Sequence, residues 1–572
     1  MLTKITIRNF KRFGQAEIEL SNPVVFIGPN NSGKTSAMQA LALWDIGVKR
    51  WHEKRSGGSQ EKKKGVTVNR RDLVSIPVPH ANLLWHGLHT RDTRRIDGAQ
   101  RTDNIRIDII VEGMHKDKRW RCGLEFDYAN PESFYCRPLR LDGDERMPVP
   151  IESVETKIAF LPPMSGLAAM ETRLDDGAIN VRVGEGRTAE VLRNLCYRVQ
   201  QYRPGQWETI KQEIQRLFGV RLNEPRYIAE RGEIAMDYKD WNFTLDLSSS
   251  GRGLQQTLLL LAYMCANPGA VLLLDEPDAH LEILRQRQTY QLISDMAADS
   301  GSQVIAASHS EVLLNEAADR DSVIAFIGKP HPIVGRGSQL LKALESIGFE
   351  QYYLAEQTGW VLYLEGSTDL AILRAFARRL EYGEATEVLQ SPFVHYVGNQ
   401  PKKIADHYHG IREALPALQG VAILDRLEFS AHNVEPVNLM PWRRREIENY
   451  LCTRATLDAY VRASVEKEVP GPLFFPHENK KRLQVMHESI EEIIKGMKMF
   501  DHGSPWDADT KASDHFLIPL FRTYFKKIKL PNPMAKKSFY ELAEYVPVNE
   551  IDPEIGEKLD AIVKAAKAAK PG

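Results

Sequence analysis

The stretch that decides the fold of this chain is Gly28-Pro29-Asn30-Asn31-Ser32-Gly33-Lys34-Thr35. It fits the pattern G-x-x-x-x-G-K-[ST], follows the apolar run 24–27, and leads into residues 36–41, which have a helix-like pattern. Glycines let such a loop wrap closely around a phosphate, whose charge is bound by backbone N–H groups and by the helix N-terminus. Lys34 would reach the terminal phosphates, and the Thr35 hydroxyl would hold Mg²⁺. The sequence therefore predicts a nucleoside triphosphate site.

A second strand-like segment ends in two adjacent carboxylates. The apolar residues 270–274 run directly into Asp275 and Glu276. Such a strand suits the interior of a parallel sheet whose carboxyl end faces the phosphates. Asp275 would support the Mg²⁺ shell, and Glu276 would polarise the attacking water as a general base. This pair predicts hydrolysis of the bound nucleotide.

Two further segments complete a set of four. Ser249 and Gly251 come just before the apolar, helix-like residues 254–264, and small residues at a helix N-terminus form a natural anion site. His309 follows the strand-like residues 303–308, which places it for a contact with a γ-phosphate. In this order the four segments resemble the ATP-binding-cassette (ABC) heads of RecF and SMC proteins, and residues 5–13 look like the first strand and turn of those heads.

The resemblance covers residues 1–340 and implies an α/β fold, an ABC-type P-loop ATPase head that binds ATP and Mg²⁺. It implies that Ser249 and Gly251 complete the nucleotide site of a partner protomer, that Asp278 begins the D-loop, and that His309 is the switch histidine. ATP would then lie between two heads. The resemblance thus also implies a homodimer or a higher homo-oligomer formed through the ATPase heads.

The composition is that of a cytoplasmic protein with several domains. The chain has 572 residues and a formal net charge of -1, and its five cysteines form no C-x-x-C pair. Neither a disulfide framework nor a zinc site is indicated. No signal-peptide pattern opens the chain, and no apolar run is long enough to span a bilayer. We therefore expect a cytoplasmic location and no membrane partner.

Three regions of the head are distinguished by their charge or by the spacing of their apolar residues. Residues 45–104 form a basic insertion, concentrated in 49–71, which is either a nucleic-acid contact or a solvated surface loop. Residues 105–160 alternate apolar and polar positions and predict antiparallel strands of a strand-rich lobe. Residues 185–220 show helical spacing and predict a helical insertion, an arm or dimerisation subdomain.

Beyond an expected linker at 341–357, acidic and glycine residues follow a series of apolar strand-like runs. The series is Glu365, Asp369, Gly398 and Asp425. A carboxylate at a strand end and another in the following helical turn can converge on one cation, and a glycine between them allows the sharp turn. Carboxylates crowded on parallel strand ends repel one another and are kept ionised by Mg²⁺, which aligns a phosphodiester and the attacking group. This series resembles the TOPRIM domain of topoisomerases, primases and OLD-family nucleases, over residues 358–455.

Residues 442–451 look like the element that closes the metal site in OLD-type enzymes; the alternative is a charged surface helix. The resemblance implies that Glu448 is a further ligand of Mg²⁺ or Mn²⁺ and that the neighbouring arginines bind phosphate. TOPRIM domains carry D-x-D at the third strand end, but here Leu427 stands where the second aspartate belongs. Glu428 is one residue further and on the opposite face of an extended chain. Either Glu365, Asp369, Asp425 and Glu448 form the metal site alone, or catalysis is weakened or lost.

An ABC-type head followed by a C-terminal TOPRIM α/β domain resembles the OLD (overcoming lysogenisation defect) family, which includes nuclease components of bacterial anti-phage systems. The family places a catalytic lysine late in the domain. The resemblance therefore implies that Lys536 or Lys537 is catalytic, in a helical C-terminal extension at 456–572. The alternative is that both are surface lysines on a helical cap.

The OLD resemblance implies an ATP-regulated, metal-dependent nuclease of anti-phage defence whose heads gate cleavage of nucleic acid, with DNA favoured over RNA. One open alternative is an ATP-gated sensor or scaffold that holds an accessory defence protein, a toxin or a reverse transcriptase without cutting. Another is a nuclease for RNA such as tRNA, since metal-assisted phosphodiester chemistry does not itself read a 2′-OH. A DNA-repair role is disfavoured, because no long heptad coiled coil divides the head.

Overall fold

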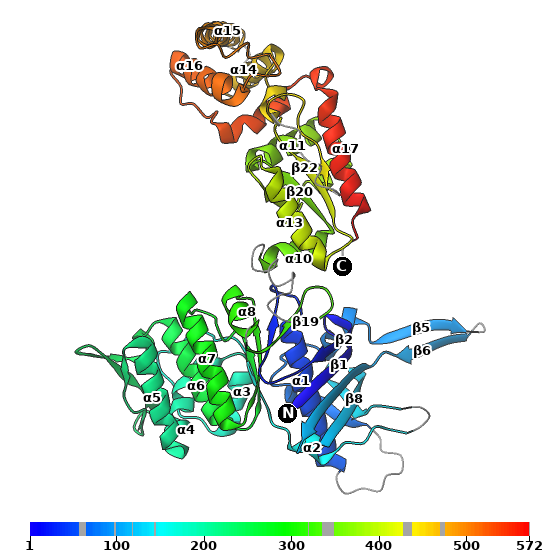
Figure 1. Cartoon of the computed structure of the whole chain (residues 1–572), viewed down its shortest axis with the longest axis vertical. Helices are drawn as coiled ribbons and strands as arrows, with labels where there is room; N and C mark the ends of the chain where they lie inside the picture. The colour runs from blue at the N-terminus through cyan, green and yellow to red at the C-terminus, as the bar shows by residue number, and fades with distance from the viewer. Residues whose placement is uncertain are drawn as a thin grey trace. The chain divides into compact units, whose positions relative to one another are not determined.

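The computed structural model describes residues 1–55, 65–96, 99–116, 118–141, 145–318, 320–333, 348–426, 437–468 and 475–570. The chain divides into two compact units, Met1–Phe349 and Glu350–Gly572 (Figure 1). The division falls within the region predicted as a linker, 341–357. Residues 341–347 lie outside the described part, and most of the remainder is helix α10 (Phe349–Thr358) instead of extended linker. In the part of the chain described here, no helix combines the length and apolarity needed to cross a lipid bilayer.

The first unit contains a six-stranded sheet in which every neighbouring pair is parallel except β18 with β19. The strand order is β10-β16-β17-β3-β18-β19. The strands are β3 (Val24–Ile27), β10 (Ile158–Leu161), β16 (Val271–Asp275), β17 (Gln303–Ser308), β18 (Ser322–Ala325) and β19 (His331–Ile333). The central strands β3, β16 and β17 are buried along their whole length, which explains their continuous apolar runs. Their carboxyl ends lie at one edge of the sheet.

A second, antiparallel sheet of the same unit has the strand order β2-β1-β7-β8-β9-β4. Its strands are β1 (Leu2–Phe10), β2 (Phe13–Glu19), β4 (Val66–Asn69), β7 (Ile107–His115), β8 (Lys118–Asn130) and β9 (Ser133–Pro138). The alternating residues 105–160 supply three of these strands. Helix α1 (Lys34–Arg55) contacts both β1 and β7 of this sheet and β10 of the parallel sheet, so it lies within the shared hydrophobic core.

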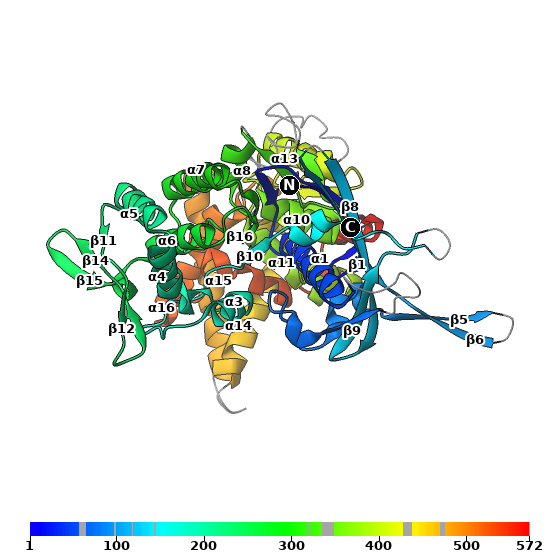
Figure 2. The same cartoon turned by 90° about the horizontal axis from the view of Figure 1, so that it is seen from below.

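Helix α1 continues past the start of the predicted basic insertion. Trp44, Val48 and Trp51 recur at helical spacing and are buried, which extends the helix through residue 55. The predicted insertion 45–104 therefore begins too early, and residues 56–64 lie outside the described part. Strands β5 (Arg91–Ile96) and β6 (Ala99–Asn104) form a separate hairpin, which extends away from the rest of its unit in Figures 1 and 2.

A helical lobe adjoins the parallel sheet. It consists of α3 (Asp176–Gly184), α4 (Leu192–Tyr202), α5 (Pro204–Phe218), α6 (Arg252–Ala266) and α7 (Ile283–Ser300). Helices α4 and α5, which the sequence predicted as an arm, both pack against α6 (Figure 1). Their apolar faces supply the contact, since Leu195, Trp207 and Ile210 are buried. These helices therefore pack into the lobe, and their role as an arm or dimerisation subdomain stays a prediction.

Short elements complete the first unit. They are α2 (Ile151–Glu155), α8 (Glu311–Ala318), β11 (Arg221–Leu222), β12 (Arg226–Ile228), β13 (Glu233–Ala235), β14 (Asp237–Asp240) and β15 (Phe243–Asp246). Strands β14 and β15 form a hairpin, which is followed by the 3₁₀ helix Leu247–Ser249 and then by α6. This connection places Ser249 and Gly251 between the hairpin and the helix N-terminus.

The second unit contains a parallel sheet in the order β21-β20-β22-β23. Its strands are β20 (Trp360–Leu364), β21 (Val394–Tyr396), β22 (Gln419–Ile423) and β23 (Asn438–Leu439). Helices α11 (Ser367–Arg379), α12 (Gly383–Val388) and α13 (Pro401–Ala414) connect or flank them. Because all pairs are parallel, the residues that follow β20 and β22 lie at the same sheet edge.

The C-terminal extension is helical, and its last helix packs against the sheet instead of forming a separate cap. It comprises α14 (Arg454–Glu468), α15 (Phe475–Met499), α16 (Ile518–Ile528), a 3₁₀ helix (Lys536–Tyr545) and α17 (Pro553–Ala568). Helix α17 returns to contact β20, β22, α11 and α12 (Figure 1). One hydrophobic core joins the sheet, α11 and this extension. The last helix is therefore part of the sheet-bearing body.

Candidate functional site

The phosphate-binding loop connects β3 to α1, and two of its glycines are required by geometry. Gly28 and Gly33 have φ values of 157° and 107°. A Cβ at Gly28 would lie 2.9 Å from the Phe326 carbonyl oxygen, and one at Gly33 would lie 2.9 Å from the Phe13 ring. Asn31 also has a positive φ, 64°. The loop backbone therefore has a conformation that side chains at the two glycines would prevent.

Lys34 is held inside this loop. Its ammonium donates to the carbonyl oxygens of Gly28 and Pro29, both at 2.7 Å. Burial lowers the pKa of Lys34 to about 8. The two carbonyl bonds keep the ammonium at the concave face of the loop. A phosphate bound there would add the negative charge that a buried lysine requires.

The end of β16 meets the start of α1. The Thr35 hydroxyl donates to Asp275 Oδ2 at 2.8 Å, which joins the two side chains that the sequence predicted as Mg²⁺ ligands. Burial raises the pKa of Asp275 to about 6, and the adjacent charge of Glu276 adds to this rise. A bound cation would oppose this rise, because positive charge favours the ionised carboxylate. The hydroxyl and carboxylate oxygens fit Mg²⁺, which prefers oxygen ligands.

Glu276 occupies a strained backbone position beside His309. Its φ is 52°, and its N–H donates to the Ala307 carbonyl at 2.9 Å. Glu276 Oε1 lies 3.5 Å from His309 Nδ1, and this contact lowers the pKa of Glu276 and raises the pKa of His309. A left-handed conformation at a non-glycine residue costs energy and is common at functional sites. In this backbone conformation the Glu276 side chain lies beside His309.

One cleft contains the loop and both strand-end carboxylates. Its volume is about 290 Å³, and it is lined by Arg12, the loop residues 30–36, Asp275 and Glu276. Arg12 was not singled out from the sequence, although it belongs to the predicted turn after the first strand. Asp278 is buried beside the cleft and accepts a hydrogen bond from the Ser308 hydroxyl at 2.9 Å.

Ser249 and Gly251 do not line this cleft. Ser249 ends the 3₁₀ helix Leu247–Ser249, and Gly251 is the N-cap of α6. A Cβ at Gly251 would meet no described atom within 4 Å, so the backbone there is open to an approaching molecule. The structure therefore does not bring the predicted signature residues to the nucleotide cleft of their own chain.

The second unit contains another site, where the sheet ends in carboxylates. Glu365 follows β20, and Asp369 lies in the first turn of α11. Asp369 Oδ2 accepts from the backbone N–H groups of Glu365 and Gly366, at 3.1 and 3.2 Å. Burial raises the pKa of Asp369 to about 6. Glu365 Oε2 is also buried, and the described residues provide no hydrogen-bond partner for it.

Asp425 follows β22 and lies against Glu365. Burial raises the pKa of Asp425 well above its usual range, and the charge and hydrogen bond of Glu365 raise it further. Two buried carboxyl groups in contact cannot both ionise without a nearby cation. Residues 427–436 lie outside the described part, so Leu427 and Glu428 are not placed.

Glu448 approaches the same sheet edge from the 3₁₀ helix Ile447–Tyr450. It is 4% exposed, and burial followed by the charge of Glu446 raises its pKa to about 7. Glu446 is buried as well and accepts from the Ser513 N–H at 2.5 Å. Glu446 was not predicted from the sequence, although its position two residues before Glu448 was a usable signal.

These groups surround one cleft of about 590 Å³. Its lining residues are Glu365, Gly366, Thr368, Asp369, Gly398, Asn399, Asp425, Arg426, Arg445, Glu446, Glu448, Lys511 and Lys536. The cleft thus includes the predicted residues Glu365, Asp369, Asp425, Glu448 and Lys536, whereas Lys537 is not among its lining residues. Lys511 was missed, because nothing in its local sequence distinguishes it from a surface lysine.

The two lysines of this cleft are joined by an aspartate. Asp514 lies 2.6 Å from Lys511 and 3.7 Å from Lys536. Of the arginines expected to bind phosphate, Arg443 pairs with Glu557 at 2.6 Å and Arg444 with Asp552 at 3.4 Å. Both of these pairs use residues of, or next to, α17. Arg445 is the member of the three that lines the cleft.

The carboxylate cleft suits a hard divalent cation held by few protein ligands. Within the described ranges, no three His, Cys, Asp or Glu side chains are positioned to ligate one ion together. Mg²⁺ commonly keeps several waters and takes only one or two carboxylates from the protein. The buried oxygen of Glu365 and the adjoining carboxyl of Asp425 fit that arrangement.

Comparisons with known proteins agree with the geometry of the first unit. The family profile described as "AAA ATPase domain" matches residues 1–45, which include the phosphate loop. The profile described as "AAA domain, putative AbiEii toxin, Type IV TA system" matches residues 198–315, which include Asp275, Glu276 and His309. The first unit carries an ATPase domain of the AAA class. No curated protein matches the chain.

Solved structures similar to this chain include SMC heads. The SMC head domain from Thermotoga maritima has 15% sequence identity and a TM-score of 0.32, with coverage of 58% of this chain and 98% of that chain. An Smc head with an extended coiled coil, bound to the C-terminal domain of ScpA derived from Pyrococcus furiosus, has 13% identity, a TM-score of 0.33, and coverage of 60% and 99%. These scores add no detail to either site.

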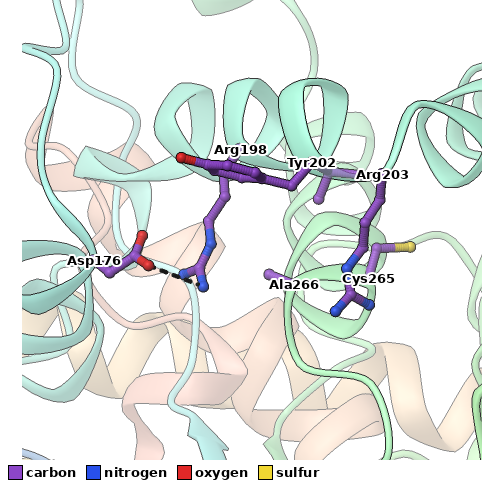
Figure 3. A pocket seen from close by; sticks show the side chains of 7 residues that line it. Asp176, Arg198, Tyr202, Arg203, Cys265 and Ala266 are labelled. Carbon is purple, nitrogen blue, oxygen red and sulfur yellow. Dashed lines mark ion pairs between the residues drawn. The ribbon is translucent and has the colours of Figure 1, made fainter.

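The ATPase domain has another hollow, which is separate from its nucleotide cleft. This hollow of about 230 Å³ lies among α3, α4 and α6 (Figure 3). Arg198 and Asp176 form an ion pair of 3.2 Å there, and Tyr202, Arg203 and Cys265 also line the hollow. Its lining includes neither a glycine loop nor a strand-end carboxylate pair. We therefore assign the nucleotide to the cleft at Lys34.

Proposed function

We propose that this chain is an ATP-regulated, divalent-metal-dependent nuclease of the OLD type that acts in anti-phage defence. The observation that carries the proposal is the carboxylate cleft of the second unit. Glu365 and Asp425, which follow two parallel strands, line this cleft together with Glu448, Lys511 and Lys536. Acidic and basic side chains in one cleft suit binding of a cation together with a phosphodiester.

Each group in the cleft has a role that follows from its surroundings. Glu365 and Asp425 would hold the cation, because their close contact is relieved by positive charge. Bound Mg²⁺ or Mn²⁺ would supply polarisation of the phosphodiester and activation of water. Lys511 and Lys536 would neutralise the phosphate, and Asp514 holds both lysines on one side of the cleft. Asp369 is fixed by two backbone N–H groups and would keep the turn after β20 in place.

The ATPase domain would regulate this cleft. Glu276 is the candidate general base for ATP hydrolysis, and His309 is oriented toward it. Ser249 and Gly251 lie apart from the cleft of their own chain, which supports the proposal that they complete the site of a second copy. ATP binding would then assemble a homodimer and license cleavage. DNA is the favoured substrate.

The decisive experiment measures cleavage of plasmid DNA, single-stranded DNA and tRNA by the purified chain, with Mg²⁺ or Mn²⁺ and with or without ATP. We expect metal-dependent cleavage that is lost in Asp425→Asn. Glu544→Gln is the matched control, because Glu544 forms only an exposed pair with Arg378 on the same unit. Undiminished cleavage by Asp425→Asn would overturn the assignment of the cleft.

A non-cutting sensor or scaffold is the second candidate. It is favoured by the finding that no three ligating side chains of the described residues are positioned around one ion. On this alternative the cleft would bind a nucleic acid or a partner protein without cleaving it. Absence of cleavage under every metal and nucleotide condition, with nucleic-acid binding retained, would select it.

A further inference from the structure

Three aromatic rings are stacked in the C-terminal extension. Phe500 and His502 have ring centroids 6.1 Å apart with an interplanar angle of 28°, and His502 and His515 are 3.9 Å apart at 17°. Phe500 is at one end of this stack and is 71% exposed. The preceding Met499 is 81% exposed. The stack therefore presents an apolar, aromatic end to solvent.

The other end of the stack adjoins the carboxylate cleft. The His515 N–H donates to the Lys511 carbonyl at 3.0 Å, and Lys511 lines the cleft. Ser513, two residues before His515, donates its N–H to the cleft residue Glu446. Asp514, between them, pairs with both cleft lysines. The three-ring stack is thus connected to the cleft by consecutive residues.

A stack of this kind has little value for stability at its outer end. Burying a phenylalanine side chain stabilises a fold, but most of that gain is not realised when the side chain is 71% exposed. Exposed aromatic rings beside positive charge are, however, the usual means of holding single-stranded nucleic acid, since every base has a face that can stack. Positive charge is close in sequence to both ends of the stack. Exposed Lys498, in the last turn of α15, lies two residues before Phe500, and Lys511 lies four residues before His515.

We propose that Phe500, His502 and His515 form a base-stacking platform that guides a single strand of nucleic acid into the carboxylate cleft. The proposal rests on the nuclease function proposed above and specifies its substrate as single-stranded at the site of entry. Bases of a duplex are already stacked on one another and offer no free face to Phe500. An unpaired base can add to the stack and bring its phosphate toward Lys511 and Lys536.

Binding without cleavage tests the platform directly. The full chain is titrated in EDTA against a fluorescent oligothymidylate of about 20 nucleotides, and anisotropy is measured. A strand of equal length built from abasic sites has the same phosphates without base faces. Phe500→Leu, which keeps an apolar side chain but removes the ring, should weaken oligothymidylate binding by about 5- to 150-fold, the range for loss of one base stack. It should leave binding of the abasic strand and of a duplex unchanged.

Two further variants complete the test. Phe500→Trp retains a stacking ring and should bind oligothymidylate at least as tightly as the unmodified chain. Phe243→Leu alters a phenylalanine of nearly equal exposure, 70%, on the ATPase domain and should have no effect. The proposal is refuted if Phe500→Leu binds oligothymidylate normally, or if it weakens binding of the abasic strand equally.

The outcome is independent of the nuclease assay. Because anisotropy is measured in EDTA, a platform that binds bases would be detected even if Asp425→Asn showed that the cleft does not cut. Conversely, metal-dependent cleavage lost in Asp425→Asn, together with normal binding by Phe500→Leu, would retain the nuclease and reject the platform.

Discussion

Glu554 on α17 offers a sharp test of how the carboxylate cleft is held together. It is 1% exposed and accepts hydrogen bonds from the Arg443 N–H at 3.0 Å and from the Tyr450 hydroxyl. The Lys558 ammonium lies 3.2 Å away and also donates to the Pro441 carbonyl at 2.9 Å. Glu554 thereby ties the last helix to the segment that carries Glu446 and Glu448.

Glu554→Ala should strongly destabilise this attachment. Removing one partner of a buried ion pair costs about 3–5 kcal/mol, because the remaining charge and hydrogen-bond donors are left buried. The second bond of Lys558 to Pro441 places the expected cost toward the lower value. At 1.4 kcal/mol per factor of ten, local opening of α17 should become more frequent by roughly a hundredfold or more.

Hydrogen exchange followed by mass spectrometry measures this opening in peptides from 437–452 and 553–568. The control is Glu557→Ala, which removes an exposed ion pair to the Arg443 side chain from the same helix and should cost no more than about 1 kcal/mol. Peptides of the ATPase domain should be unchanged in both variants. Equal exchange rates in Glu554→Ala and Glu557→Ala would refute the idea that Glu554 anchors the helix.

Three further predictions concern the ATPase domain. Glu276→Gln should retain nucleotide binding but slow the release of phosphate from ATP by about 10²–10⁴-fold, which is the usual contribution of a general base. The control Glu230→Gln changes an exposed residue and should hydrolyse ATP normally. Normal hydrolysis by Glu276→Gln would exclude the assigned role. Gly33→Ala should abolish nucleotide binding in equilibrium dialysis, because Gly33 has a φ of 107° and an added Cβ would meet Phe13. The control Gly205→Ala should bind nucleotide normally, because the space around its Cβ is open. Burial raises the pKa of Asp45 to about 6. Between pH ~4 and ~6 the folded state therefore keeps a proton that the unfolded chain has lost, so the free energy of unfolding falls as the pH rises through this window. Asp45→Asn should flatten that fall in thermal unfolding; an unaltered pH profile would show that Asp45 is not its source.

The nucleotide cleft could be predicted from sequence because each part is local. The loop, the strand before it and the helix after it are contiguous. Asp275 ends one fully buried strand, and His309 directly follows another. Parallel pairing then brings these strand ends to one edge without further information. Arg12 could not be predicted in the same way, since its place depends on a turn of the antiparallel sheet packing beside the loop.

The carboxylate cleft was only partly predictable. Glu365 and Asp425 follow buried strands, so the same rule placed them together. Lys511 and Asp514 come from the connection between α15 and α16, whose approach to the sheet depends on tertiary packing and leaves no local pattern. The boundary at residue 45 was wrong for a related reason, because basic residues on one face of α1 concealed the buried Trp44, Val48 and Trp51 on the other.

The C-terminal extension contributes charged side chains to the carboxylate cleft. The sheet contributes Glu365 and Asp425, and burial beside Glu365 raises the pKa of Asp425. A cluster of that kind needs positive charge nearby, and the extension supplies it through Lys511 and Lys536. The extension also donates the Ser513 N–H to the buried Glu446 carboxylate. The carboxylates and the lysines come from segments that only tertiary packing brings together. A chain truncated after residue 455 would therefore keep the acidic groups of the cleft and lose the lysines that balance their charge.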